Sequence, residues 1–114
     1  MAKMKATPRT YAQAVEALAG RDSVKLGNNT LLEKRGYVQN DSVHIAVRLH
    51  STDIVCFFPD GRVTLHSGGY RTMTTKERLN QFIVSTVYQK NYNWFVYRAS
   101  DGSTVEFTEG MNVA

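Results

Sequence analysis

The side chains that could carry chemistry are few in this chain of 114 residues, which contains three histidines and one cysteine. His44 and His50 fall on the same face of an expected strand but lie six residues apart, about 20 Å at the usual strand rise. They cannot share one ion on a straight strand, and no Cys-x-x-Cys or His-Glu-x-x-His spacing is present. We therefore expect no metal site and no cofactor.

Nucleophilic and acid–base catalysis are also poorly supported by the sequence. Cys56 lies in the apolar run IVCFF at residues 54–58, which predicts a buried and unreactive thiol. The chain has no Gly-x-Ser-x-Gly elbow, and its acidic residues flank strands and turns without forming a pair. We expect no catalytic residues and no enzymatic activity.

A glycine-rich bend, SGGYRTMTTK at residues 67–76, is the first candidate binding site. Gly68 and Gly69 let backbone N–H groups approach a ligand, and the start of the following helix adds free donors. Together with Thr75, they are candidates for binding a phosphate or a carboxylate. The alternative interpretation is a plain strand-to-helix connection in which the threonines cap the helix, and the spacing is not that of a Walker loop.

A second candidate surface combines aromatic and basic side chains near the C-terminal hairpin. Exposed aromatic rings beside cations stack on bases and pair with phosphates, but the same residue types also suit a core or a protein interface. Strand alternation would place Tyr88 and Lys90 on one face while Trp94 and Val96 pack inward. The candidate residues for binding a nucleic acid or a protein partner are Arg71, Lys76, Arg78, Lys90, Tyr92, Trp94 and Arg98.

The net charge of +4 and the sequence pI of about 9.4 are compatible with nucleic-acid binding by this second surface. Residues 62–98 hold six Lys or Arg residues against the single acid Glu77. Such a block suits a face that binds polyanions, although an ordinary protein surface often carries the same bias.

The elements that must position these side chains are short. Residues 1–9 are basic and lack periodicity, which predicts a flexible arm, and residues 10–114 are expected to form a single α+β domain. One helix follows Thr10, and a second begins near Thr74, where Thr74 and Glu77 have capping-box spacing. About seven short strands with hairpin-length connections predict a strongly curved antiparallel sheet or a partly open barrel with two short helices.

Two strands are predicted with the most detail. Residues 42–50 alternate between apolar and polar side chains, which indicates a strand buried on one face. Residues 54–58 are apolar throughout, which favours a central strand covered on both faces. The sequence Pro-Asp-Gly-Arg at residues 59–62 then predicts a tight turn into the next strand.

No segment has the pattern of a signal peptide or of a membrane span. The N-terminus lacks the required apolar run, and the longest apolar run has five residues, at 54–58. We expect a cytoplasmic protein that does not contact a membrane.

Two segments together resemble a group of small uncharacterised bacteriophage proteins. These segments are KLGNNT at residues 25–30 and RLHSTDIVCFFPDGRVTLHSGGYRTMTTKERLNQF at residues 48–82. The shared pattern is an LGNNT turn, an LHxTDIV strand, a PDG hairpin and an SGG(W/Y)xTxTTKxRIN segment. The chain departs from it modestly, with Tyr70 where Trp is commoner and Leu79 where Ile is.

The resemblance implies a phage accessory protein that acts in the cytoplasm of an infected bacterium. It implies no mechanism, and by analogy such proteins bind a host or phage protein, here including a second copy of this chain. A nucleic-acid-binding surface and a small phosphate-type ligand at the Gly68–Gly69 bend stay open as alternatives.

Overall fold

The computed structural model describes residues 4–36 and 43–114, and these form two helices and nine strands. The prediction of an α+β fold is confirmed, with two more strands than the seven expected. The elements are α1 (Tyr11–Leu18), β1 (Ser23–Gly27), β2 (Thr30–Arg35), β3 (His44–Leu49), β4 (Thr52–Phe57), β5 (Val63–Leu65), α2 (Met73–Gln81), β6 (Thr86–Lys90), β7 (Asn93–Tyr97), β8 (Thr104–Glu106) and β9 (Met111–Asn112).

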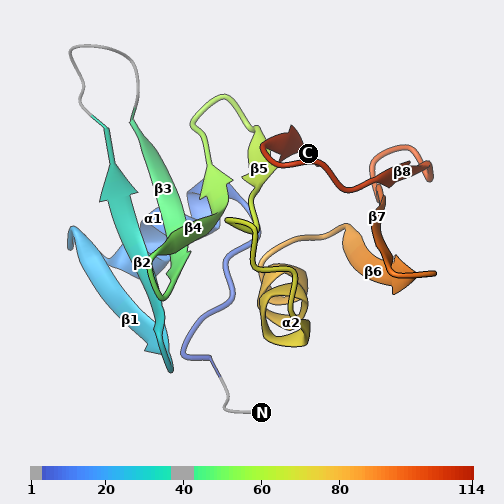
Figure 1. The fold of residues 1–114 in the computed structure, drawn as a ribbon. Coiled ribbons are helices and arrows are strands. Elements are labelled where there is room, and N and C mark those ends of the chain that lie inside the picture. Colours follow the sequence, from blue (N-terminus) through green and yellow to red (C-terminus); the bar gives the residue numbers. More distant parts are fainter. Residues whose placement is uncertain (1–3, 37–42) are drawn as a thin grey trace.

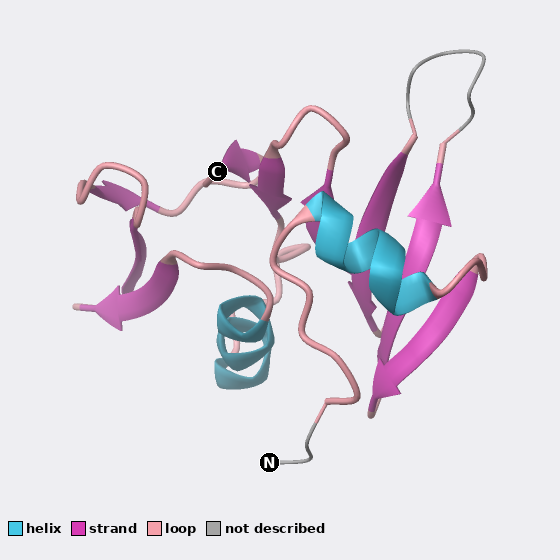
Figure 2. Ribbon diagram, turned by 180° about the vertical axis from the view of Figure 1, so that it is seen from behind, coloured by secondary structure: helices cyan, strands magenta, loops and turns pink. Residues whose placement is uncertain are grey.

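The strands form two separate sheets, and every pairing is antiparallel. The larger sheet has the order β1-β2-β3-β4-β5-β9, and the smaller has the order β6-β7-β8. Helix α1 lies across one face of the larger sheet, and α2 lies between the two sheets (Figures 1 and 2). The sheets are curved but do not close into a barrel.

The core of the larger sheet follows from the alternation that the sequence shows. In β3 the side chains of Ile45, Val47 and Leu49 are buried, as predicted, and belong to one core cluster with Ala14 and Leu18 of α1. Ala46 was predicted on the polar face of this strand, but it is buried too. The expected strand began at residue 42, which lies outside the described residues. Burial of these apolar side chains is the main favourable term that holds the helix on the sheet.

Strand β4 lies between β3 and β5, in the central position that its apolar sequence predicts. All four residues from Ile54 to Phe57 are buried. The turn after it is also confirmed, because Gly61 has a φ of +97° and its N–H donates to the carbonyl of Phe58. A left-handed residue at this point is nearly free of strain only for glycine.

Both helices begin close to the predicted positions, but the cap of the second is not the predicted one. The side chain of Thr10 accepts a hydrogen bond from the N–H of Gln13 and caps α1. The cap of α2 is Thr72, with an extended backbone, and its Oγ1 accepts from the N–H of Thr75. The predicted capping box at Thr74 is wrong because Thr74 already lies in the first helical turn.

Part of the segment predicted as a flexible arm over residues 1–9 lies against the domain, and residues 1–3 lie outside the described residues. Met4 is 7% exposed and packs with the core, and Pro8 is buried as well. The N–H of Lys5 donates to the carbonyl of Leu26 at the outer edge of β1. Residues 4–9 therefore lie against the domain, since the side chain of Met4 gains an apolar environment there.

Helix α2 also contacts the edge of the smaller sheet through one side chain. The Asn80 amide accepts a hydrogen bond from the N–H of Val87 at 2.7 Å and donates to the carbonyl of Val87 at 2.9 Å. These two bonds replace the pairing that another strand would make with β6 at this residue.

Candidate functional site

The Gly68–Gly69 bend has the geometry of an anion-binding loop, and a carboxylate from the chain itself lies in it. Both glycines have positive φ values, +62° and +84°. The N–H groups of Ser67 and Gly68 donate to Glu109 Oε1 at 2.8 and 3.0 Å, and Ser67 Oγ donates to Oε2 at 2.7 Å. The predicted anion-binding donors are thus engaged within the fold.

Charge and hydrogen bonding keep this carboxylate ionised. Burial raises the pKa of Glu109, but hydrogen bonds from Ser67 and Gly68 and the charge of Arg71 outweigh burial and hold the pKa below its usual value. Thr75, the third residue predicted for the anion site, is 4% exposed, and its N–H donates to Thr72. The structure brings Gly68 and Gly69 together but directs Thr75 elsewhere.

Arg71 links the bend to the smaller sheet. Its guanidinium lies 5.0 Å from the ring centroid of Phe107 and 5.8 Å from that of Trp94, and 3.9 Å from Glu109 Oε2. Cation–π contacts of this kind stabilise the position of the cation over the rings. Arg71 is therefore held by contacts within the protein.

The other residues predicted for a nucleic-acid or partner surface lie in different environments. Arg78 is 7% exposed, and its Nη1 donates to Gln81 Oε1 at 3.2 Å. Trp94 is 2% exposed and packs edge-on against Phe107. Lys76 and Arg98 are partly buried, whereas Lys90 and Tyr92 are exposed. The seven predicted residues do not share one exposed face.

The smaller sheet presents a row of aromatic rings on its outer side. Tyr88 and Phe95 are cross-strand partners with stacked rings whose centroids are 5.8 Å apart. Tyr97 lies on the same side and is 48% exposed. The opposite side carries the buried residues Val87, Trp94 and Val96, as the alternation predicts. We call Tyr88, Phe95 and Tyr97 the aromatic face.

The charges beside the aromatic face are few and mixed. The register places Lys90 at one end of β6 and Glu106 opposite Phe95 on β8. The remaining neighbours on this side are uncharged, namely Thr86, Asn93 and Thr104. A face with aromatic rings and little charge resembles the centre of a protein interface more than a nucleic-acid surface.

Tyr92 extends from the tip of the β6–β7 hairpin and is 95% exposed. Asn91 and Tyr92 form the two-residue turn, with φ values of +52° and +68°. A turn of this type favours Asn at the first position and Gly at the second, and a tyrosine with positive φ is strained. Neither burial nor backbone preference explains a tyrosine here.

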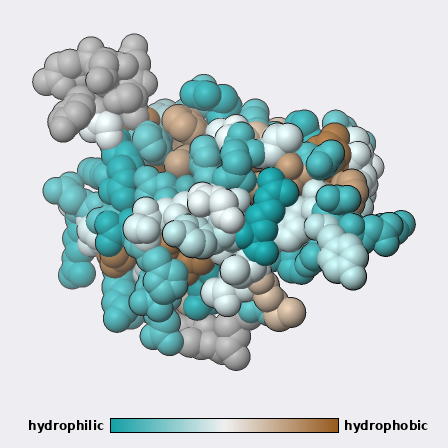
Figure 3. All heavy atoms as spheres, viewed as in Figure 1, coloured by the Kyte–Doolittle hydropathy of each residue, from teal (hydrophilic) through white to brown (hydrophobic). Residues whose placement is uncertain are grey.

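The remaining exposed apolar side chains are dispersed. The face of the molecule in Figure 3 is mostly hydrophilic, and its hydrophobic residues appear in small separate groups. The exposed large apolar side chains outside the smaller sheet are Val15, Tyr70, Met73 and Val84. Scattered exposure of this kind is normal for a folded protein.

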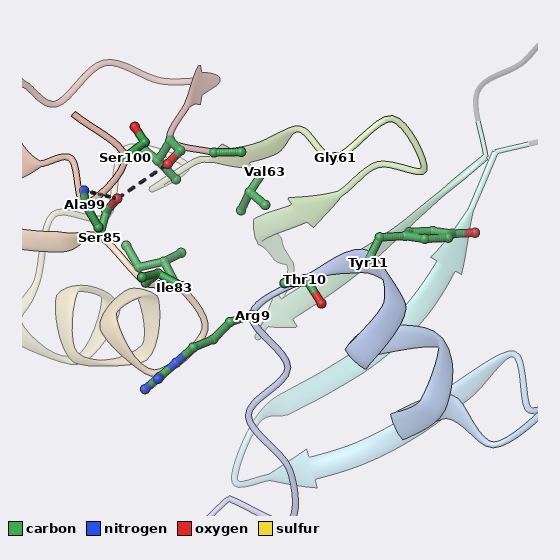
Figure 4. Close-up of a pocket in the computed structure, with 12 residues that line it drawn as sticks. Arg9, Thr10, Tyr11, Gly61, Val63, Ile83, Ser85, Ala99 and Ser100 are labelled. Atoms are coloured by element: carbon green, nitrogen blue, oxygen red, sulfur yellow. Dashed lines mark hydrogen bonds between the residues drawn. The ribbon is translucent and has the colours of Figure 1, made fainter.

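A pocket of about 380 Å³ opens where the two sheets and the start of α1 meet, which we call the junction pocket (Figure 4). Four segments far apart in the sequence contribute to it, together with the C-terminal residues. Its apolar wall comes from Val63, Ile83, Val84 and Val113. Arg9 is the one charged side chain among the residues that line it.

A smaller pocket, of about 270 Å³, lies between the β3–β4 turn and the Gly68–Gly69 bend. Leu49 and Ile54 line it together with the polar side chains of His50, Ser67 and Thr75. All of its lining residues lie within the 48–82 segment that resembles phage proteins.

The His, Cys, Asp and Glu side chains of the described residues form no metal-binding group. Among residues 4–36 and 43–114, no group of three His, Cys, Asp or Glu side chains could hold a metal ion. Cys56 is buried as predicted, and burial raises its pKa to about 11, so its thiol is protonated at neutral pH.

The sequence alone did not identify Glu109 as the occupant of the bend or Arg9 as part of a pocket. Glu109 lies 41 residues from Gly68 in the chain, and no local signal connects the two. The aromatic face is different, because alternation within β6 and within β7, together with the two-residue turn that pairs Tyr88 with Phe95, places its members on one side.

The fold and these surfaces define an α+β protein built from two antiparallel sheets and two helices. A family model described as Kyanoviridae Gp96 protein matches residues 7–114, which is nearly the whole chain. The chain therefore belongs to this family and is a phage protein, as the resemblance implied. No curated protein and no solved structure matches it. Within the described residues, no helix is long and apolar enough to cross a membrane.

Proposed function

We propose that this phage protein acts by binding a host or phage protein through its aromatic face, without catalysing a reaction. The supporting observation is the row formed by Tyr88, Phe95 and Tyr97 on the side of the smaller sheet that faces away from its buried side chains. The site of action would be the cytoplasm of the infected bacterium.

The composition of this face supports a protein partner. Tyrosine and phenylalanine are enriched at the centres of protein interfaces, where charged residues are depleted. The face carries Lys90 and Glu106 at its margins, whose charges are opposite. Tyr92 lies beyond Lys90 at the hairpin tip, where its ring is exposed.

A nucleic-acid partner has weaker support from the same observations. Electrostatic attraction to phosphates dominates such binding and requires several cations on one surface. Arg78 is buried, and Arg71 is engaged with Phe107 and Glu109. Lys90 is the one cation that the register places beside the aromatic face.

The proposal is tested by purifying the tagged protein from infected cells in two matched variants, Tyr97→Glu and Tyr70→Glu. Both tyrosines are exposed, 48% for Tyr97 and 64% for Tyr70, but only Tyr97 belongs to the aromatic face. We expect the wild type and Tyr70→Glu to retain one specific protein, with Tyr97→Glu weakening its binding ~30-fold, the loss typical of an interface hot spot.

Two treatments distinguish the classes of partner. Nuclease treatment and a higher salt concentration should leave the complex intact, because the contact is mainly apolar. Loss of all bound material after nuclease treatment would favour nucleic acid instead. Equal binding by the Tyr97→Glu and Tyr70→Glu variants would show that the aromatic face is not the contact surface.

A further inference from the structure

The junction pocket is held open by hydrogen bonds between the segments that form its walls. Ser85 Oγ accepts from the N–H of Ala99 at 3.1 Å and lies 3.4 Å from the carbonyl of Val113 (Figure 4). The N–H of Val113 in turn donates to the carbonyl of Val63 at 2.9 Å. These bonds fix three walls relative to one another, so the pocket is preformed.

The size and lining of the pocket suit a small molecule. A volume of about 380 Å³ lies within the range of known ligand sites, roughly 300–1,000 Å³. Its surface is mainly apolar, and four hydroxyl-bearing residues, Thr10, Tyr11, Ser85 and Ser100, belong to its lining. Val84 is 67% exposed at the rim, although a valine gains stability from burial.

The charged groups of the pocket lining are the Arg9 side chain and the carboxylate of the terminal residue Ala114. Among the lining side chains Arg9 alone is charged, and the described residues contain no ion pair of its guanidinium. In Figure 4 the Arg9 side chain extends from the start of α1 on the side of Ile83. The N-terminus of α1 adds a partial positive charge beside Arg9.

From these observations we propose that the junction pocket binds a small apolar molecule that carries one anionic group. The apolar body lies against Val63, Ile83 and Val113, and the anion lies near the Arg9 guanidinium. An exposed anion–guanidinium contact contributes modestly to binding, so most of the affinity comes from the apolar body. This site is separate from the aromatic face and does not depend on the proposed function.

The test compares octanoate with 1-octanol, which have the same chain length and differ in charge. Binding is followed by titration calorimetry and by the amide NMR shifts of Ala99, Ser100 and Val113. We expect saturable binding of both probes, with octanoate ~5-fold tighter than octanol because of the contact with Arg9. An equal affinity for the two would overturn the anionic part of the proposal.

Two variants locate the binding site. Arg9→Gln should remove the preference for octanoate, whereas Arg21→Gln, an exposed arginine after α1, should leave the preference unchanged. Ser100→Trp places a large ring at an exposed position of the lining and should abolish binding of both probes. Far-UV circular dichroism checks that this variant folds.

Three results would contradict the proposal. The first is that neither probe binds the wild type saturably. The second is that Arg9→Gln and Arg21→Gln lose the preference for octanoate equally. The third is that a folded Ser100→Trp variant binds both probes as the wild type does. None of these results bears on the protein partner, because Tyr97 and Tyr70 lie outside the pocket lining.

Discussion

Tyr92 and Trp94 lie two residues apart in one hairpin and have opposite environments. The ring of Trp94 is 2% exposed among core side chains, whereas Tyr92 is 95% exposed in a strained turn. A residue that neither packs nor suits its backbone is a candidate for recognition, since strain of this kind concentrates at functional positions.

The Tyr92→Gly variant should be more stable than the wild type. Relief of the left-handed strain exceeds the entropy that glycine adds to the unfolded chain, so the free energy of unfolding should rise by about 0.5–1 kcal/mol. Urea unfolding measures this change. Asn91→Gly is the matched control and should gain less, because asparagine tolerates a positive φ. A loss of stability in Tyr92→Gly would mean that the tyrosine supports the fold.

For single residues, the sequence predicts burial well where strand alternation applies. It predicts burial poorly where a side chain packs against residues far away in the chain. Cys56 was expected to be buried, and it is, whereas Trp94 was a candidate for partner binding and is buried instead. Arg78 was expected at the surface, but it is buried on α2, since its position relative to the core depends on where the helix begins and what it packs against. Charge alone does not determine exposure.

The connection between β5 and α2 depends on two adjacent glycines in different ways. A Cβ atom on Gly68 would lie 2.7 Å from Thr52 Oγ1 and 2.8 Å from its Cγ2, whereas one on Gly69 would meet open space. Both residues have positive φ. Gly68 therefore satisfies a steric and a conformational requirement, and Gly69 only the second.

We predict that Gly68→Ala destabilises the protein more than Gly69→Ala. The conformational strain alone should lower the free energy of unfolding by about 1 kcal/mol at either position, and the contact with Thr52 should add a further ~1–3 kcal/mol at Gly68. Adding Thr52→Ala should bring Gly68→Ala close to Gly69→Ala in a thermal unfolding series. Equal losses in the two single variants would argue against the close approach.

The carboxylate in the bend makes stability depend on pH. Because the pKa of Glu109 is lowered in the folded protein, its contribution is fully present above the unfolded value of about 4.5. This contribution is lost as the pH falls through the folded pKa. Glu109→Gln should therefore lower stability at pH 7 by about 1 kcal/mol and reduce the loss of stability on acidification.

The control for this prediction is Glu106→Gln, an exposed glutamate on β8. Its stability should match that of the wild type at pH 7. Identical acid unfolding of the wild type and Glu109→Gln would show that the carboxylate does not stabilise the bend.

The sequence predicted both helices and nearly all of the strands, but not which threonine caps α2. Thr72, Thr74 and Thr75 are all suitable caps by residue type, and only the backbone decides among them. Thr72 has φ −101° and ψ 165°, the extended conformation that a cap requires. Strand β9 was missed because two residues give no periodicity.

The two sheets share one hydrophobic core although they do not pair with each other. Trp94 of the smaller sheet and Phe107, which directly follows β8, belong to the same cluster as Val47 and Phe57 of the larger sheet. The single tryptophan reports on the smaller sheet, and far-UV circular dichroism reports on the whole chain. Cooperative unfolding is the expectation for one core.

We predict coincident unfolding midpoints for Trp94 fluorescence and circular dichroism in urea. Ser85→Ala removes the hydrogen bonds to Ala99 and Val113 and should lower the free energy of unfolding by about 1–2 kcal/mol. The urea midpoints of both signals should then fall together. An earlier fluorescence transition would show that the smaller sheet unfolds on its own.

At the scale of the whole molecule, hairpins were predictable and the relation between the sheets was not. Consecutive strands such as β3–β4 and β6–β7 pair through short connections, as their turn sequences indicate. The β5–β9 pairing joins residues nearly 50 positions apart, and the position of α2 separates the sheets. A curved or nearly closed sheet was expected because the sequence does not show where pairing stops.

The contact between Asn80 and Val87 has a consequence for self-association. Growth of a fibre by strand addition requires every molecule to offer two open edges, one for each neighbour. In the smaller sheet, the edge strands are β6 and β8. The Asn80 amide bonds the free backbone groups of Val87 in β6, so β8 is the edge that stays open to another strand. Association through this sheet would therefore end at a pair of molecules instead of continuing into a polymer.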